Sequence, residues 1–378
     1  MVQIYTKMER KSLLPVSGRA AKEVFFKSNR NNSGKKLIYA HLCRMQVSAE
    51  NLSRKIFEVT EHDFNTVCLE VFHFQYRNNI VYKSYCDLIK RVPSTVRQYN
   101  EIPFLPISLF KRYDIKTTDF IPEAIFESSG TTGTATSRHC IKDLNLYEKS
   151  FLRNFVQQYG RPEEYCILGL LPSYLERDSS SLVYMVNKLC ELSGNSKSGF
   201  YLYNFSELAS LLRENTNNGV KTLLIGVTYA LLDFAEAFPL DLSEVMVMET
   251  GGMKGRKREM LRESVHDILK SRLNLSTVHS EYGMTELLSQ AYSRGEGLFQ
   301  PPPWMRVLCR EQDDPLTVLP SGENAKGPAN IIDLANLYSC AFISTDDLVG
   351  LRGDGSFEVL GRIDHSDLRG CNLLVAEA

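Results

Sequence analysis

The chain has 378 residues, a formal net charge of -1, 43% hydrophobic residues and 24% charged residues. This composition excludes a disordered chain and predicts a soluble globular protein built around one large catalytic body. The near-neutral balance argues against nucleic acid as a partner, because binding to a polyanion needs a broad excess of Lys and Arg.

The number and spacing of the cysteines indicate whether the protein works in a reducing or an oxidising compartment. Nine are scattered through the chain without a CxxC pair, a pattern that predicts reduced thiols, a cytoplasmic protein and no structural zinc. No apolar run approaches the ~20 residues that span a bilayer, and the N-terminus lacks the apolar core of a secretory signal. We therefore expect neither membrane insertion nor export.

The N-terminal region is basic. Residues 1–50 hold ten Lys and Arg against three Glu, an excess of seven positive charges. Loop-forming residues at 28–34 interrupt this stretch, so we expect residues 1–55 to be a disordered extension and residues 56–378 to be the catalytic domain. A basic organelle-targeting sequence is the alternative, which the acidic residues and weak periodicity disfavour.

Regular structure is expected to begin at Thr60, where Thr60 and Asp63 can form a capping box before an apolar face of helical spacing. Short apolar runs follow at 124–126, 166–171, 222–225 and 245–248. Helical patterns separate these runs, one of them behind a Ser206 cap. Such alternation predicts an α/β fold in which helices cover parallel sheets.

The strongest local signal is the stretch at 125–134, where a short apolar run leads directly into hydroxyl and glycine residues. Glycines let the backbone approach a ligand, and N–H and hydroxyl groups can donate to phosphate oxygens. The stretch predicts a phosphate-binding loop. It is not a Walker loop, because no Lys follows the last glycine. A flexible surface loop is the alternative interpretation.

Two further segments carry side chains with possible chemistry. The sequence SEYGMTE at 280–286 holds an aromatic ring, a glycine, a hydroxyl and a carboxylate, and STDDL at 344–348 supplies carboxylates after an apolar run. The second segment precedes GRID at 361–364 by about one hairpin. Each is weak alone, since acidic turns are usually solvated loops.

Taken in order, SSGTTGT, YGMTE, TDDL and GRIDHSDLRG resemble the motifs of the adenylate-forming superfamily of acyl-CoA synthetases and related ligases. The resemblance covers roughly residues 56–378. It implies the large N-terminal domain of that fold, with helix-covered β-sheets and a small β subdomain. It also implies ATP and Mg²⁺ as cofactors and a carboxylic acid as substrate.

Residue by residue, the resemblance implies that the loop holds the ATP phosphates and that Glu286 holds Mg²⁺. Tyr282 would lie against adenine, Asp347 would accept the ribose hydroxyls, and Arg362 would reach the ribose or phosphate. The other implied nucleotide contacts are Ser128, Ser129, Gly130, Thr131, Thr132, Gly133, Thr134, Gly251 and Gly252. Two alternatives stay open, namely that Tyr282 is a core residue and Arg362 a surface ion pair.

LuxE-type acyl-protein synthetases are a closer match, through IPFLPISLFK at 102–111, PPW at 302–304 and TDD at 345–347. In that family a fatty acid is adenylated and then held on a cysteine near the C-terminus, a place that Cys371 occupies here. The resemblance thus implies catalytic roles for Thr131, Glu286 and Cys371. An acyl carrier protein, coenzyme A or an acyl-reductase is the implied partner.

The chain also departs from the superfamily pattern. It ends shortly after the hinge-like segment, so we expect the mobile C-terminal domain and its lysine to be absent. Asp367 stands where the hinge motif has Lys, and Lys254 is a candidate replacement. Near the expected acyl site, only Tyr174 matches the bulky residue that the family often places there.

Two other functions remain open. One is a ligase that ends at coenzyme A, like the phenylacetate-CoA ligases, which the expected absence of the C-terminal domain disfavours. The other is a non-catalytic nucleotide- or acyl-binding subunit of a complex, which the intact loop and Glu286 disfavour.

Overall fold

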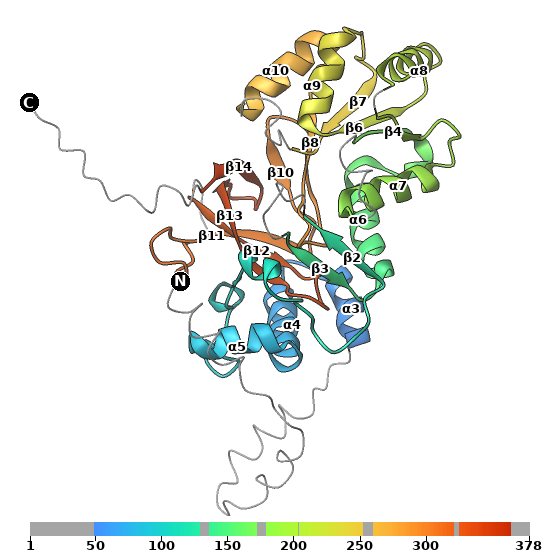
Figure 1. Cartoon of the computed structure of the whole chain (residues 1–378). Coiled ribbons are helices and arrows are strands. Elements are labelled where there is room, and N and C mark those ends of the chain that lie inside the picture. The colour runs from blue at the N-terminus through green and yellow to red at the C-terminus, as the bar shows by residue number, and fades with distance from the viewer. Residues whose placement is uncertain are drawn as a thin grey trace, which may run out of the picture.

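A computed structural model gives the arrangement of the chain (Figure 1). The structure describes residues 49–128, 136–171, 179–202, 204–251, 260–320 and 325–363.

One half of the main sheet is parallel. Its five strands lie in the order β5-β4-β6-β7-β8, each parallel to its neighbours. Their bounds are Cys166–Leu170 (β4), Gly199–Phe200 (β5), Thr222–Gly226 (β6), Val245–Glu249 (β7) and His279–Tyr282 (β8). The apolar runs at 166–171, 222–225 and 245–248 form β4, β6 and β7, so the predicted parallel sheet is confirmed.

Helices cover this half, as the alternating pattern predicts. Those that follow or precede its strands are Leu144–Tyr159 (α6), Ser181–Ser193 (α7), Phe205–Asn217 (α8), Thr228–Ala237 (α9) and Arg262–Leu273 (α10). Helices α8, α9 and α10 gather around β6 and β7 at one end of the molecule (Figure 1). The fold class is therefore α/β.

The other half of the same sheet is antiparallel. From β8 it continues through β9, β10, β14, β13, β12 and β11, and β1 adds in parallel to β13. The bounds are Leu105–Pro106 (β1), Ala291–Ser293 (β9), Leu298–Gln300 (β10), Met305–Cys309 (β11), Lys326–Asp333 (β12), Phe342–Leu351 (β13) and Phe357–Arg362 (β14). Strand β8 thus belongs to both halves.

A separate two-stranded sheet consists of Ala124–Glu127 (β2) and Arg138–Ile141 (β3), paired antiparallel. The run at 124–126 does form a strand, β2, but its expected place in a parallel sheet is wrong. The last residue of β2 is held just before the start of α7, because the Glu127 N–H donates to the Ser179 carbonyl over 2.8 Å.

The N-terminal helices pack against the antiparallel half. They are Ala49–Glu58 (α3), Phe64–Asn78 (α4) and Ile80–Leu88 (α5). The buried Gln75 side chain of α4 donates to the Asn336 and Leu337 carbonyls and accepts from the Ala341 N–H, over 2.9 to 3.0 Å. One amide thereby fastens α4 to the connection between β12 and β13.

The expected start of regular structure at Thr60 is wrong. Helix α3 already begins at Ala49, and the expected domain boundary at residue 55 falls inside it. The Thr60–Asp63 pair does form, with the Thr60 N–H donating to Asp63 over 2.7 Å, but Asp63 rather than Thr60 is the N-cap of α4. Similarly, Ser206 lies within α8, whose N-cap is Asn204.

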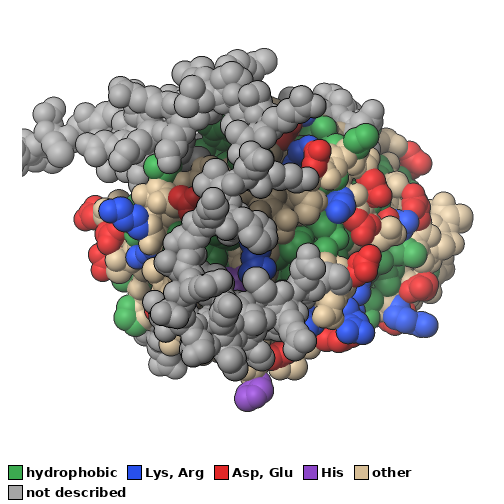
Figure 2. Space-filling view, turned by 90° about the horizontal axis from the view of Figure 1, so that it is seen from below, with side chains coloured by type: hydrophobic (Ala, Val, Ile, Leu, Met, Phe, Trp, Pro, Cys, Tyr) green, Lys and Arg blue, Asp and Glu red, His purple; other side chains and the backbone are tan. Residues whose placement is uncertain are grey.

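On the face in Figure 2, acidic and basic side chains are interspersed over the described part of the surface, in keeping with the small net charge. None of the helices within the described ranges combines the length and apolar character that crossing a membrane requires.

We predict that α3 is an integral part of the core. The Phe57 side chain is buried, and its ring meets Trp304 edge to face at 5.1 Å. Replacing Phe57 with Ala leaves a cavity between α3 and the sheet, so the free energy of unfolding should fall by about 3 kcal/mol or more. Urea unfolding measures the loss. Ile121→Ala, at a side chain that is 92% exposed, is the control and should change stability little. Equal stability of Phe57→Ala and wild type would place α3 outside the core.

Candidate active site

The base of the predicted phosphate loop is closed by two serines. The Ser128 N–H donates to the Ser137 carbonyl over 3.0 Å, and the Ser137 N–H donates to the Ser128 hydroxyl over 2.9 Å. These bonds extend the β2–β3 hairpin and fix where the loop leaves it and returns. The remaining predicted loop residues lie outside the described residues. They are Ser129, Gly130, Thr131, Thr132, Gly133 and Thr134.

Glu286 lies beside this base. Its side chain is buried, and burial raises the pKa of the carboxyl, while a hydrogen bond from Ser137 and the positive charges of Arg362 and Lys111 oppose the shift. Ser137 therefore contacts both Ser128 and Glu286. The structure brings together two predicted elements, the base of the loop and the last residue of YGMTE, that are far apart in sequence.

Tyr282, Asp347 and Arg362 form a second group. The Tyr282 hydroxyl donates to Oδ2 of Asp347 over 2.8 Å, and Nε of Arg362 donates to Oδ1 over 2.8 Å. Asp347 and Arg362 are opposite each other on the paired strands β13 and β14. The predicted hairpin between TDDL and GRID is thus confirmed.

The burial and packing of Tyr282 and Arg362 bear on the nucleotide contacts expected of them. The Tyr282 ring is buried, and it meets the Phe357 ring at 5.3 Å and the Phe299 ring at 5.8 Å. Tyr282 is accordingly a core residue, as the alternative interpretation has it. The Arg362 side chain is 71% exposed, so its ion pair alone contributes little stability. A carboxylate accepts about four hydrogen bonds, so Asp347 retains room for further donors.

The glycine turn after β7 is also ordered by a carboxylate. Gly251 has φ of 72°, in the left-handed region that favours glycine. Its N–H donates to the Glu249 carboxylate over 2.7 Å, and its carbonyl accepts from the Thr228 N–H over 3.3 Å. Gly252 and Lys254 lie outside the described residues.

Two side chains from β12 and the turn after it hold the segment that follows YGMTE. Asp333 accepts the Leu288 N–H over 2.7 Å and the Ser289 N–H over 3.0 Å, and Asn336 Nδ2 donates to the Glu286 carbonyl over 2.6 Å. Burial raises the pKa of the Asp333 carboxyl despite these bonds. The backbone at Glu286 is therefore fixed from the antiparallel half of the sheet.

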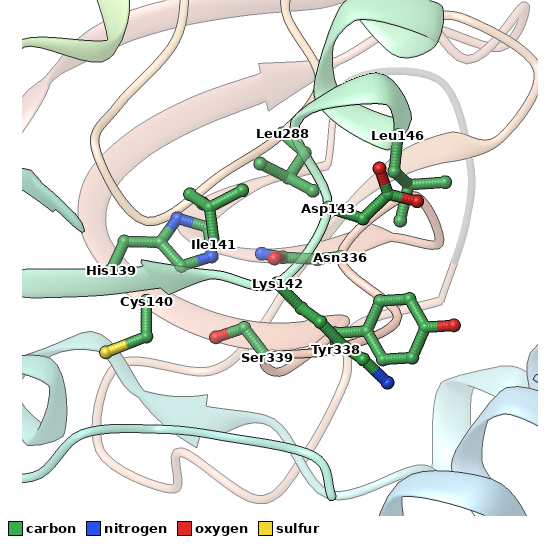
Figure 3. Close-up of a pocket in the computed structure, with 10 residues that line it drawn as sticks. All are labelled: His139, Cys140, Ile141, Lys142, Asp143, Leu146, Leu288, Asn336, Tyr338 and Ser339. Carbon is green, nitrogen blue, oxygen red and sulfur yellow. The ribbon is translucent and has the colours of Figure 1, made fainter. Parts of the chain in front are cut away.

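A small cavity lies behind this segment (Figure 3). His139 and Asn336 point toward one another across it, and Nδ1 of His139 lies 2.8 Å from the Thr285 carbonyl oxygen. Burial lowers the pKa of His139 to about 4, so its ring is neutral near pH 7. With about 10 Å³ open to a water molecule, the cavity has room for about one water and not for a substrate.

The sequence analysis missed two buried glutamates near the site, Glu249 and Glu281. Burial opposes ionisation of Glu249, but the neighbouring His266 ring, the charge of Arg262 and the Gly251 N–H hold its pKa at about 2. Burial and the neighbouring Glu249 charge raise the pKa of Glu281 to about 8. No hydrogen-bond partner of the Glu281 carboxyl is found among the described residues. For Glu249 the available signal was an acid at the end of the apolar run VMVM, whereas the sequence of β8, HSEY, gave no such signal for Glu281.

Two candidate residues cannot be compared with the structure. Tyr174 and Cys371 lie outside the described residues. The described cysteines are free thiols, and burial raises the pKa of several, for example Cys309 to about 11. These groups are poor nucleophiles near neutral pH, because the thiolate is the reactive form.

The strand order and the positions of the side chains define an α/β fold with a candidate ligand site at one edge of the parallel strands. In such sheets, ligand sites lie at the carboxyl ends of the parallel strands, where Gly251 follows β7 and Glu286 follows β8. The sequence matches the acyl-protein synthetase family LuxE over residues 45–378. The chain belongs to this family, and the predicted resemblance is confirmed.

Curated relatives of the chain include two proteins named long-chain-fatty-acid–luciferin-component ligase. The one from Vibrio harveyi is 23% identical over 330 residues, covering 81% of this chain and 85% of the relative. The one from Aliivibrio fischeri is 24% identical over 311 residues, covering 77% and 80%.

Solved structures with similarity to the chain include ATP-bound MatB from Rhodopseudomonas palustris, with a TM-score of 0.46, 16% identity and coverage of 65% of this chain and 50% of that chain. A long-chain-fatty-acid-CoA ligase from Archaeoglobus fulgidus has a TM-score of 0.44 and 16% identity, covering 63% and 51%. The chain spans about half the length of these solved proteins.

We predict that Glu281 makes stability fall as pH rises. Its folded pKa of about 8 exceeds the ordinary value of 4.5, so the folded state keeps a proton that the unfolded state releases. The stabilising contribution is complete below about pH 4.5 and is lost as pH rises through about 8, by about 1.4 kcal/mol for each pKa unit. Glu281→Gln should remove this slope in urea-unfolding free energies measured between about pH 5 and pH 8.

The matched control is Glu263→Gln, at an exposed position in the first turn of α10. It should keep the wild-type slope. Parallel pH profiles for wild type and Glu281→Gln would show that Glu281 is ionised in the folded protein.

Proposed function

We propose that the chain activates a carboxylic acid with ATP, forming an acyl adenylate, and then transfers the acyl group to a protein thiol. The observation that carries the proposal is that β3, which follows the loop, is joined to the segment that holds Glu286: Nδ1 of His139 lies 2.8 Å from the Thr285 carbonyl oxygen, and Ser137, bonded to Ser128, lowers the pKa of Glu286. This junction puts the base of a hydroxyl- and glycine-rich loop beside a buried carboxylate, at the carboxyl end of β8. Phosphate oxygens accept hydrogen bonds from hydroxyl and backbone N–H groups, and Mg²⁺ binds carboxylate oxygens.

The names of the two relatives support a long-chain fatty acid as substrate, since both are long-chain-fatty-acid ligases. In the first step, a carboxylate oxygen of the acid attacks the α-phosphorus of ATP. A carbon–oxygen–phosphorus linkage forms, the bond between the α-phosphorus and the bridging oxygen breaks, and pyrophosphate leaves. The family match and the motif order both support ATP as the nucleotide.

The residues present fit Mg²⁺, which prefers oxygen ligands. Glu286 and the Ser128 hydroxyl, both beside Ser137, would supply oxygen ligands here. Within the described ranges no group of three or more His, Cys, Asp or Glu side chains is placed to hold a metal ion. Phosphate oxygens of the nucleotide would be further ligands of the kind that Mg²⁺ takes. When bound, Mg²⁺ would neutralise charge on the phosphates. Glu286 must be ionised to hold it.

Other side chains orient the nucleotide in this proposal. Asp347, fixed by Tyr282 and Arg362, accepts the ribose hydroxyls through its remaining lone pairs. Arg362, with its exposed guanidinium, lies near enough to Glu286 to oppose the shift of its pKa, and it can donate to ribose or phosphate oxygens. Tyr282 acts mainly by holding Asp347.

In the second step, a thiolate attacks the acyl carbon, a thioester forms, and AMP leaves with the electrons of the broken acyl–phosphate bond. The thiol proton passes to solvent or a base. We propose Cys371 as the acceptor, in the sequence Arg369-Gly370-Cys371. A neighbouring arginine, Arg369, favours the thiolate.

We predict that the purified protein catalyses exchange between pyrophosphate and ATP that depends on a carboxylic acid and Mg²⁺. Glu286→Gln should lower the exchange rate about 100-fold, because it removes the charge that holds the metal. The measurement uses labelled pyrophosphate and a panel of fatty and aromatic acids. Glu163→Gln, at an exposed site in a short helical turn, is the control and should leave the rate unchanged.

Two results would count against this proposal. Absence of exchange with every acid of the panel would exclude adenylation. Wild-type exchange by Glu286→Gln would remove Glu286 from the site while leaving the adenylation reaction in place.

We also predict that Cys371 carries the acyl group. After incubation with ATP and radiolabelled acid, wild-type protein should hold label that neutral hydroxylamine releases, and Cys371→Ala should hold none while keeping pyrophosphate exchange. Cys140→Ala is the control thiol, since burial raises the pKa of Cys140. Persistent label on Cys371→Ala would place the acceptor on another residue, and label only on added coenzyme A would favour the coenzyme A ligase.

A further inference from the structure

The Glu249 carboxylate at the end of β7 is fully engaged. Its Oε2 accepts the Gly251 N–H over 2.7 Å and the Thr228 hydroxyl over 3.0 Å. Its Oε1 accepts Nε of Arg262 over 3.1 Å and lies 3.8 Å from Nε2 of His266. A buried carboxylate with this many donors stays ionised and fixed in position.

The glycine turn depends on this carboxylate. Gly251 adopts a left-handed φ of 72°, and a Cβ added there would meet no described atom within 4 Å. Steric crowding by the described atoms therefore does not explain the glycine at position 251. The left-handed φ does. Its N–H is held by Glu249 and its carbonyl by the Thr228 N–H, so both sides of the turn are fixed while the space beside the Cα is open.

Arg262 links that carboxylate to the other half of the sheet. It begins α10, and its guanidinium lies 5.0 Å from the centre of the Phe299 ring in β10. Its Nη1 donates to the Val359 carbonyl of β14 over 3.4 Å. Val359 precedes Arg362 by three residues on the strand that pairs with Asp347. A single side chain thus joins the glycine turn of the parallel half to the hairpin of the antiparallel half.

We infer that Arg262 is a positioning residue that, through Glu249 and Val359, sets the separation between the Gly251 turn and the Asp347–Arg362 hairpin. The inference rests on the proposed function, with Asp347 and Arg362 at the nucleotide, and on the nucleotide contact that the family resemblance implies for Gly251. Arg262 itself contacts no substrate. Its role is geometric, because one planar guanidinium can donate in two directions while its face packs on an aromatic ring.

The test measures ATP binding directly, so it does not require the acid to be known. Calorimetric titration of the full chain with ATP and Mg²⁺ gives the Kd for wild type, Arg262→Ala and Arg262→Lys. We expect Arg262→Ala to weaken binding at least tenfold. Arg262→Lys should recover part of the lost affinity. Its ammonium group can still pair with Glu249, but it cannot at the same time donate to the Val359 carbonyl as the guanidinium does.

Arg306 provides a matched control. Its guanidinium lies 3.9 Å from the centre of the Phe64 ring and pairs with Glu61, and its side chain is 22% exposed against 28% for Arg262. Arg306→Ala also loses an ion pair and a contact with an aromatic ring, in a part of the molecule away from Gly251 and Asp347, although Glu61 is 83% exposed and Glu249 is 4% exposed. We expect a smaller drop in Tm for Arg306→Ala than for Arg262→Ala, because no buried carboxylate loses its partner, and a Kd for Arg306→Ala within twofold of wild type.

Each result separates the inference from the proposed function. A Kd for Arg262→Ala within twofold of wild type, or equal weakening in both Ala variants, would overturn the positioning role while leaving the proposed function standing. Failure of the wild-type protein to bind ATP would instead overturn the proposed function. If Arg262→Ala does not fold, Arg262→Lys decides, because wild-type affinity in that folded variant would overturn the role.

Discussion

The burial of Asp333, the last residue of β12, is the constraint on which the site depends. Its carboxylate takes two backbone N–H groups from the segment after YGMTE, as well as the Ser289 hydroxyl over 2.6 Å. Unpaired backbone donors at this depth would be costly. The segment therefore follows β12 rather than moving freely, and Glu286 takes its place beside Ser137 as a consequence.

Buried acids near the site differ in how they are satisfied, and this separates their roles. Glu249 and Asp347 each pair with an arginine, Arg262 and Arg362 respectively. Asp333 receives neutral donors and fixes backbone. Glu281 has no donor among the described residues and is held protonated by burial and by Glu249. Position in a strand alone would not distinguish these carboxyls, whereas their partners do.

Much of the fold could be predicted from the sequence, because buried parallel strands leave short apolar runs that are hard to mistake. The runs at 166–171, 222–225 and 245–248 all form strands. Helix α3 was missed because its buried face has only three residues, Leu52, Ile56 and Phe57, next to a basic stretch that suggested disorder. Its packing partner, Trp304, is too distant in sequence for any local pattern to reveal.

The site was predictable in its members but not in their contacts. Motif order selected Tyr282, Asp347 and Arg362, and the hairpin spacing anticipated that the last two would meet. It could not show that Tyr282 would be a core residue, since an aromatic in a motif suits either a ligand or a core. Arg262 left no signal at all, because its partners come from three separate strands.

In the Tyr282–Asp347–Arg362 group, one hydrogen-bond donor is buried and the other is largely exposed. The Tyr282 hydroxyl is fixed by a ring packed between Phe299 and Phe357, whereas the Arg362 guanidinium is largely exposed. Asp347 is buried, so losing both donors together would strand its charge. The packed Tyr282 ring keeps its hydroxyl on Asp347. If Arg362 pairs with another anion, Asp347 loses one hydrogen-bond donor rather than two, which costs less free energy. A carboxylate anchored by a buried phenol thus allows its arginine to act elsewhere in the site.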